Sequence, residues 1–284
     1  MSYYIHISEK NIGYAEKIKS LFNYVDVKAE EAKQLQQKAD QVIAGTASSS
    51  TSNIAGKIAI LGDSLSSALG YDATGAAQKS LIDILGKDIT NVSRGGMTTY
   101  EALTGKKPDA ISGLQEASAF APFGGTFETF LNSVKPETVL LRYGAADAAL
   151  LKDPATTISN IEKMIQLSKT AGSSPVLVGI PPVAKSGDTR HGGVYGNYFD
   201  FMSPLVDEIN SGMQSLAAKY GIKYINLSNI QIPQGGLLDG LHPNVETGEI
   251  IARAISDQIK TITTQTTTAP PTTTAVTTKP TTTK

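Results

Sequence analysis

The sequence has no cysteine among its 284 residues. This absence excludes a disulfide scaffold, a zinc site built on thiolates and a cysteine nucleophile. It leaves the cellular compartment open, because a chain without cysteine is indifferent to redox conditions. If the protein uses covalent catalysis, the nucleophile must be a serine, a threonine or a carboxylate.

The sequence also lacks an excess of either charge and lacks long hydrophobic runs. Its 25 Lys and Arg residues balance 26 Asp and Glu residues, for a formal net charge of -1. Because nucleic acids and anionic membranes attract basic surfaces, we expect neither as a partner. No stretch approaches the roughly 20 apolar residues that span a bilayer, so we expect no membrane insertion. The N-terminus has no basic patch, apolar core or cleavage site of a secretory signal, so we expect no cleavable leader.

Composition divides the chain into four segments. Residues 1–45 contain a heptad pattern of apolar residues from Ile18 to Val42, which indicates either one amphipathic helix or a short oligomeric coiled coil. Residues 46–54 are small and polar, as in a flexible linker. Residues 55–260 carry the regular pattern of a globular domain. Residues 261–284 are rich in Thr and Pro and have too few apolar side chains to offset the entropy of ordering, so we expect a disordered tail.

The globular domain alternates between strand and helix patterns. Short, β-branched apolar runs predict five strands buried on both faces, at residues 57–61, 89–92, 138–143, 175–180 and 222–226. Apolar residues at helical spacing lie between and after them, at Ile158, Ile161 and Ile165; at Leu205, Ile209, Met213 and Leu216; and at Ile251, Ala254, Ile255 and Ile259. This alternation predicts an α/β fold with a five-stranded parallel sheet between two helical layers. Ligands bind such sheets outside the carboxyl ends of the strands.

The first predicted strand leads directly into Gly62, Asp63 and Ser64. A serine at a turn from strand to helix can expose its Oγ above the sheet, where backbone N–H groups can stabilise an oxyanion. The same tripeptide is also an ordinary turn with a helix cap. Ser64 is therefore a candidate nucleophile that needs a partner base.

A second candidate segment precedes the last predicted helix and contains Asp239 and His242. An imidazole within hydrogen-bond reach can accept the proton of a serine, and a carboxylate can orient its other ring nitrogen. The sequence has three histidines, of which His6 lies outside the domain and His191 is the competitor within it. Asp239 and His242 are therefore the favoured partners of Ser64.

Together these segments resemble the SGNH, or GDSL-type, hydrolase family over residues 55–260. Gly62, Asp63 and Ser64 match the first block of that family, and Asp239 with His242 matches its last block. Gly96 matches the oxyanion glycine of the second block, with Gly95 as the alternative register. The resemblance implies a flavodoxin-like α/β/α fold, here preceded by an N-terminal helix. It also implies a Ser64, His242 and Asp239 triad, an oxyanion hole from the N–H groups of Ser64 and Gly96, and no cofactor.

The third block departs from the family pattern of Gly-x-Asn-Asp, because the chain has Gly144, Ala145, Ala146 and Asp147. Ala146 stands where the family has an asparagine that donates to the oxyanion. Loss of one such donor costs about 10²–10³ in rate, so we expect a slowed or differently assembled site. Asn197 is a candidate substitute donor. A fold that only binds a glycan is the alternative. Asp147 and Asp63 are expected to support the loops without taking part in catalysis.

Substrate selection is expected to depend on the loops that follow the strands. The loop over residues 181–200 combines glycines, aromatics and polar groups, which suits a sugar. We expect substrate contacts from four residues: Arg142, Tyr143, His191 and Tyr195. The favoured reaction is removal of a small acyl group, such as O-acetyl, from a polysaccharide. Similar domains occur in bacteriophage tail spikes, and the N-terminal heptads are compatible with that setting and with a homo-oligomer.

Overall fold

The structure is a computed structural model that describes residues 57–66, 89–108, 119–185, 187–188 and 199–266. The predicted N-terminal helix and linker lie outside these residues, as does most of the predicted tail. Three of the candidate site residues also lie outside them: His191, Tyr195 and Asn197. Their predicted roles therefore stay predictions.

Five parallel strands form one sheet in the order β2-β1-β3-β4-β5. The predicted five-stranded parallel sheet is thus confirmed, with boundaries that differ from the predicted ones by one or two residues. The strands are β1 (Ile58–Gly62), β2 (Ile89–Ser93), β3 (Thr138–Arg142), β4 (Ser174–Val178) and β5 (Lys223–Ile225).

The three helical periods expected from the sequence all form helices: α6 (Pro154–Thr170), α7 (Ser203–Tyr220) and α8 (Val245–Thr266). Helix α8 continues beyond residue 260, where the sequence places the end of the domain. The remaining described helices are shorter. They are α3 (Thr99–Thr104), α4 (Phe127–Val134) and α5 (Ala145–Leu150), with 3-10 turns η2 (Ala121–Phe123) and η3 (Asp200–Met202).

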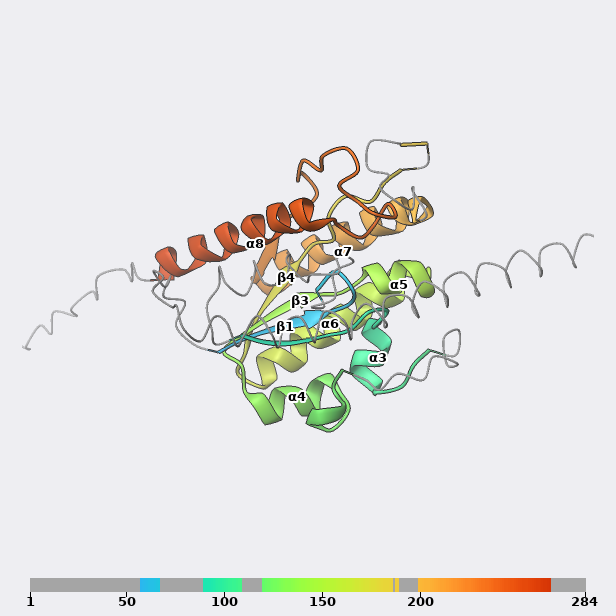
Figure 1. The fold of residues 1–284 in the computed structure, drawn as a ribbon. Coiled ribbons are helices and arrows are strands. Elements are labelled where there is room, and N and C mark those ends of the chain that lie inside the picture. Colours follow the sequence, from blue (N-terminus) through green and yellow to red (C-terminus); the bar gives the residue numbers. More distant parts are fainter. Residues whose placement is uncertain (1–56, 67–88, 109–118, 186, 189–198, 267–284) are drawn as a thin grey trace, which may run out of the picture.

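Alternation along the strands gives the sheet two buried faces. In β1, Ala59 and Leu61 join the apolar cluster that includes residues of α3, α4, α6 and α7. Ile58 and Ile60 point to the other face, where they share a cluster with α8 residues. Figure 1 shows α8 on one side of the sheet and α3, α4 and α6 on the other. Both faces of the sheet are covered, so successive side chains of a strand are buried on opposite faces. The strand sequences are therefore nearly continuous apolar runs.

The order of the strands fixes where a site can form. The chain passes from β1 to β2 on one side and then crosses to β3 on the other side of β1. Loops that leave the carboxyl ends of β1 and β3 diverge at this switch point and leave a crevice between them. The segment with Ser64 follows β1, and helix α5 follows β3.

Among the residues that the structure describes, no helix is long and apolar enough to cross a membrane.

Candidate active site

Ser64 lies in a tight turn directly after β1. The N–H of Ser66 donates to the carbonyl of Asp63 at 3.0 Å, which closes the turn around Ser64. Gly62 has to be glycine because a Cβ at this position would lie 2.3 Å from the carbonyl oxygen of Arg142 in β3. The close approach of β1 to β3 therefore fixes the point from which the turn begins. Ser64 itself is only 8% exposed.

Asp239 and His242 lie on a tight loop just before α8. Gly240, between them, has φ of 90°, a conformation that glycine adopts without the steric cost of a side chain. The Asp239 carboxylate accepts from the N–H of Leu241 at 3.0 Å and from the N–H of His242 at 2.8 Å. The N–H of Leu238 donates to the carbonyl of His242 and closes the loop. The short spacing between Asp239 and His242 in the sequence thus holds the His242 imidazole against the Asp239 carboxylate.

The two segments meet across 178 residues of sequence in one hydrogen-bonded relay. The Oγ of Ser64 lies 2.8 Å from Nε2 of His242. On the other side of the ring, Nδ1 of His242 lies 2.8 Å from Oδ2 of Asp239. Because an ionised carboxylate only accepts, Nδ1 carries the proton and Nε2 is free to accept from the serine. All three side chains are buried.

The electrostatics of Asp239 keep it ionised. Burial raises the pKa of this carboxyl, but the charge of His242 and the hydrogen bonds from His242 and Leu241 outweigh burial and lower the pKa below its ordinary value. An ionised Asp239 stabilises a positive charge on the imidazole. The arrangement can therefore remove a proton from Ser64 and hold it on His242.

Asp63 links the turn after β1 to the start of α5. One carboxylate oxygen accepts from the N–H of Leu65 at 3.1 Å, and the other accepts from the N–H groups of Ala145 at 2.9 Å and Ala146 at 3.0 Å. Burial nevertheless raises the pKa of Asp63, because it outweighs these hydrogen bonds and the nearby charge of Arg142. Asp63 thus occupies two backbone donors at the start of α5.

Asp147 fixes the start of α3. Its carboxylate accepts from the Thr99 N–H at 3.1 Å and from the Thr99 hydroxyl at 2.5 Å. The side chain of Asn160 in α6 donates to the same hydroxyl at 3.0 Å. Burial raises the pKa of Asp147 to about 7, against the lowering effect of these hydrogen bonds from Thr99. The contacts tie α3, α5 and α6 together beneath the site.

A partly buried ion pair that the sequence analysis missed lies beside Gly96. Nη2 of Arg94 lies 2.6 Å from both carboxylate oxygens of Glu101, whose side chain is 1% exposed. Nη1 of Arg94 donates to the carbonyl of Gly95 at 2.9 Å. The pair joins a loop to the first turn of α3, so no helical or strand spacing in the sequence marks it. It braces the loop that carries Gly96.

A pocket opens at Ser64, with a volume of about 310 Å³ that includes its open mouth. Its wall is mainly apolar: apart from Ser64 and His242, no described residue lining it has a polar side chain. Gly96 is part of the wall, whereas Gly95 is not, and Gly96 has φ of 69°. The other lining residues are Ala145, Ala146, Ala149, Leu150, Phe199 and Leu241. Ala146, in place of the expected asparagine, thus faces the pocket and offers it no side-chain donor.

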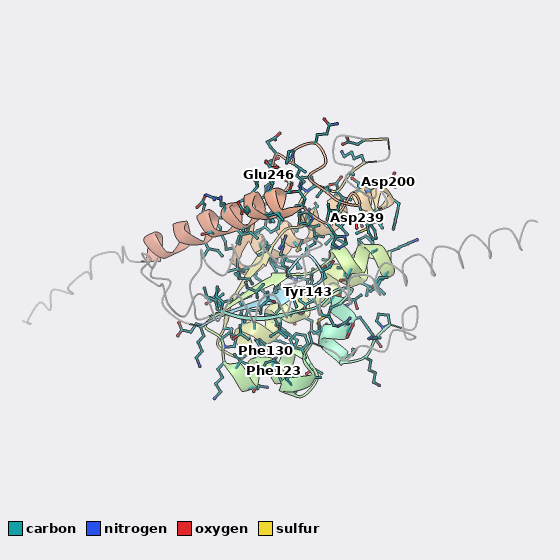
Figure 2. The ribbon with its side chains drawn as sticks, viewed as in Figure 1. Phe123, Phe130, Tyr143, Asp200, Asp239 and Glu246 are labelled. Atoms are coloured by element: carbon teal, nitrogen blue, oxygen red, sulfur yellow. The ribbon has the colours of Figure 1, made fainter. Side chains whose placement is uncertain are left out.

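Two of the predicted substrate contacts are wrong. Arg142 is 7% exposed and points inward, where its Nη1 donates to the carbonyl of Leu65. Burial lowers the pKa of Arg142 to about 10, although the nearby charge of Asp63 opposes the shift. Tyr143 is 1% exposed and packs in the apolar cluster around α6 and α7 (Figure 2). Position at the carboxyl end of β3 misled the prediction, because the turn after β1 receives the Arg142 guanidinium and the apolar cluster encloses the Tyr143 ring.

Phe199 and Leu241 are pocket residues that the sequence analysis also missed. The ring of Phe199 packs against the His242 imidazole, with 5.6 Å between centroids and an interplanar angle of 73°. The N–H of Phe199 donates to the carbonyl of Asp239. Phe199 belongs to the loop over residues 181–200, and the aromatic content of that loop was the sequence feature that could have indicated a pocket residue. In the described part of the chain, no cluster of three or more His, Asp or Glu side chains could hold a metal.

A family model described as GDSL-like lipase/acylhydrolase matches residues 60–250. This match covers more than half of the sequence and both segments of the relay. The chain belongs to the GDSL-like lipase/acylhydrolase family. This is a family of hydrolases, and the chain has the α/β fold expected for it. The match confirms the family resemblance inferred from Gly62, Asp63, Ser64, Asp239 and His242. Comparison with curated proteins gives no match.

Solved structures of low sequence identity share this fold. A GDSL-like lipase from Bacteroides thetaiotaomicron has 15% identity and a TM-score of 0.50, covering 72% of this chain and 88% of its own. The structure titled TesA has 21% identity and a TM-score of 0.50, covering 72% and 99%. A catalytic mutant of Axe2, an acetylxylan esterase from Geobacillus stearothermophilus, has 16% identity and a TM-score of 0.50, covering 74% and 96%. At these identities the likeness is one of fold.

Proposed function

We propose that this protein is a serine esterase that removes a small acyl group, such as acetyl, from a carbohydrate. The relay from Ser64 through His242 to Asp239 is the observation that carries the proposal, since both of its hydrogen bonds are 2.8 Å long. In this proposal Ser64 is the nucleophile, His242 the general base and Asp239 the group that orients the imidazole.

The proposed reaction has two steps. Ser64 Oγ attacks the ester carbonyl while its proton moves to Nε2 of His242, and the alcohol then leaves with that proton. Water next attacks the acyl-enzyme and gives a proton to His242, after which the carboxylic acid leaves and Ser64 regains its hydroxyl proton. Both steps pass through an oxyanion that needs hydrogen-bond donors.

The donor set proposed for that oxyanion is smaller than the family pattern. The N–H groups of Ser64 and Gly96 are the proposed donors, since both residues border the pocket. Ala146 contributes no side-chain donor, and its N–H already donates to Asp63. Asn197 remains the proposed substitute and lies outside the described residues. We therefore expect a slower enzyme than one with asparagine at position 146.

The shape of the pocket supports a short acyl chain. Ala145, Ala146 and Ala149 line the pocket with small apolar side chains, and Phe199 and Leu241 line it with larger ones. Such a wall suits a methyl group and offers no partner to a polar acyl chain. The fold shared with an acetylxylan esterase is consistent with an acetylated carbohydrate as substrate. A phage-tail setting stays a prediction from residues 1–45.

A catalytically weak glycan-binding module is the second candidate. The observation that favours it is Ala146, because the missing asparagine donor lowers the expected rate. In that case the relay would persist without useful turnover. The two candidates differ in whether the wild-type protein hydrolyses an ester faster than a variant without the serine hydroxyl.

Hydrolysis of p-nitrophenyl acetate by matched variants separates these candidates. We expect Ser64→Ala and His242→Ala each to lower kcat/KM by about 10³-fold or more, because each removes a partner in proton transfer. Ser66→Ala is the control, since Ser66 is buried on the same turn and its hydroxyl has no hydrogen-bond partner in the described structure. Equal slow hydrolysis by wild type, Ser64→Ala and Ser66→Ala would refute the esterase and favour the binding module.

A further inference from the structure

Aromatic rings form a continuous row that leads from the relay to the surface. Phe199 contacts the His242 ring at 5.6 Å between centroids, and Phe201 lies 6.4 Å from Phe199 at an interplanar angle of 42°. Nζ of Lys152 lies over the Phe201 ring, 5.1 Å from its centroid. The row therefore begins at the proposed general base and ends at a positive charge.

Burial decreases along this row. Phe199 is 6% exposed and lines the pocket, whereas Phe201 is 36% exposed and Lys152 is exposed. Both outer residues lie two positions beyond a pocket residue: Phe201 follows Phe199, and Lys152 follows Leu150. Figure 2 labels Asp200, the first residue of the 3-10 turn η3, toward the edge of the molecule. The outer pair thus adjoins the pocket through Phe199 and lies closer to solvent than the relay.

The Lys152 ammonium has N–H groups that make no hydrogen bond to the described residues. It makes a cation–π contact with Phe201, and among the described residues it forms no hydrogen bond and no ion pair, even with its neighbour in the sequence, Asp153. Asp153 is engaged with Thr156, whose N–H and hydroxyl both donate to it. A cation–π contact places an ammonium but leaves its N–H groups able to bind an anion.

We infer that Phe201 and Lys152 form the subsite for the alcohol part of the substrate, and that this alcohol is an acidic sugar such as a uronic acid residue. The inference rests on the proposed esterase function and narrows its substrate to an O-acylated acidic glycan. The apolar C–H face of the sugar packs on the exposed part of Phe201, and its carboxylate binds Nζ of Lys152. The ester carbon then lies inward, beside Ser64.

Helix α5 connects this subsite to the pocket. Residues of α5 line the pocket, and the N–H of Lys152 donates to the carbonyl of Asp147 at 3.0 Å just beyond the end of the helix. Lys152 has φ of 54°. Lys135 follows α4 in the same left-handed conformation, with φ of 49°, and is also exposed, but it has no part in the pocket or the aromatic row. Lys135 is therefore a matched control for Lys152.

The test compares acetylated oligogalacturonate, which is acidic, with acetylated xylo-oligosaccharide without uronic acid, which is neutral. For Lys152→Glu we expect the ratio of kcat/KM on the acidic over the neutral substrate to fall about three- to tenfold, because charge reversal removes the attraction of an exposed pair and adds a repulsion of similar size. Added salt should lower the wild-type ratio in the same direction. Lys135→Glu should leave the ratio unchanged. Equal ratios for wild type and Lys152→Glu would overturn the inference.

A binding measurement separates failure of this inference from failure of the esterase proposal. Calorimetry with acetylated oligogalacturonate would compare Ser64→Ala with the double variant Ser64→Ala and Lys152→Glu. We expect the double variant to bind about three- to tenfold more weakly, whether or not the wild-type protein turns over any ester. If the two proteins bind equally, or if neither binds, the acidic-sugar subsite is refuted. Loss of p-nitrophenyl acetate hydrolysis alone would bear on the esterase proposal.

Discussion

Tyr143 illustrates the free-energy cost of burying a polar group without a hydrogen-bond partner. Its hydroxyl is buried and has no hydrogen-bond partner in the described structure. Burial, together with the charges of Asp63, Asp147 and Glu101, raises the pKa of Tyr143 well above its ordinary value, so the hydroxyl stays neutral. An unpaired buried hydroxyl loses its hydration without receiving a replacement.

Tyr143→Phe should therefore not destabilise the protein. We expect the free energy of unfolding to stay the same or to rise by about 1 kcal/mol, because phenylalanine keeps the ring and removes the unpaired hydroxyl. Urea unfolding of both proteins at neutral pH measures the difference. A decrease of more than about 1 kcal/mol would mean that the hydroxyl makes a stabilising hydrogen bond.

Asp147 should make stability depend on pH. Its pKa rises from an ordinary value of 3.8 to about 7 in the folded protein, so the folded state holds a proton that the unfolded chain has lost between these values. This contribution to the free energy of unfolding is therefore largest at low pH and falls as the pH rises through that window.

Removal of the Asp147 carboxyl should remove this dependence. Between about pH 5 and about pH 8, we expect Asp147→Asn to lose less unfolding free energy than the wild-type protein loses. Chemical unfolding at both pH values gives the comparison, and the difference between the two proteins cancels the contribution of other titrating groups. Equal losses would show that Asp147 titrates at its ordinary pKa.

At the residue scale, motifs identified the candidate catalytic residues. The sequence did not indicate correctly which side chains at the strand ends are buried and which face the site. Ser64, Asp239 and His242 could be singled out because a proton relay requires these residue types after a strand and before a helix. Arg142 and Tyr143 stand at the end of β3, but the sequence does not say that Leu65 receives the guanidinium or that the apolar cluster encloses the ring. Such contacts depend on distant segments.

Among the elements, α5 has the largest effect on the proposed site. This six-residue helix follows Gly144, whose φ of 120° favours glycine, and it places Ala145, Ala146, Ala149 and Leu150 in the pocket wall. The N–H groups of Ala145 and Ala146 donate to Asp63, so any oxyanion donor that α5 itself supplied would have to be a side chain. The length of α5 is below two turns, which explains why apolar spacing did not predict it.

Ala146→Asn should restore the donor that the family pattern contains. We expect kcat on p-nitrophenyl acetate to rise about tenfold or more, because one oxyanion donor is worth about 10²–10³ in other enzymes. Ala149→Asn, on the same pocket wall one turn further along α5, is the control and should give no increase. An unchanged rate for Ala146→Asn would mean that another group already supplies this donor.

The long helices and the strands were predictable for a simple physical reason. Strands buried on both faces and helices of 17 to 22 residues repeat their apolar spacing often enough to be recognised. The ion pair of Arg94 and Glu101 offers no such repeat, because it joins a loop to a short helix. Elements with few turns become visible only when their partners are known.

At the scale of the whole molecule, the site forms where the order of the strands reverses, between β1 and β3. The strand order places β1 between β2 and β3, so the segments with Ser64, Gly96 and Ala145 all leave the same edge of the sheet. His242 approaches from the loop before α8 and completes the relay. The fold thus explains why residues 178 positions apart in the sequence meet at 2.8 Å.

The central claim is that Ser64 is an activated nucleophile, and covalent labelling tests it most directly. The protein would be incubated with a fluorophosphonate, and the adduct would be mapped by mass spectrometry of the intact chain and of its peptides. We predict a single adduct on Ser64, no adduct on Ser64→Ala, and undiminished labelling of Ser66→Ala, because only a serine that shares its proton with a base attacks phosphorus readily. No labelling of the wild-type protein, or equal labelling of Ser64→Ala, would contradict the claim.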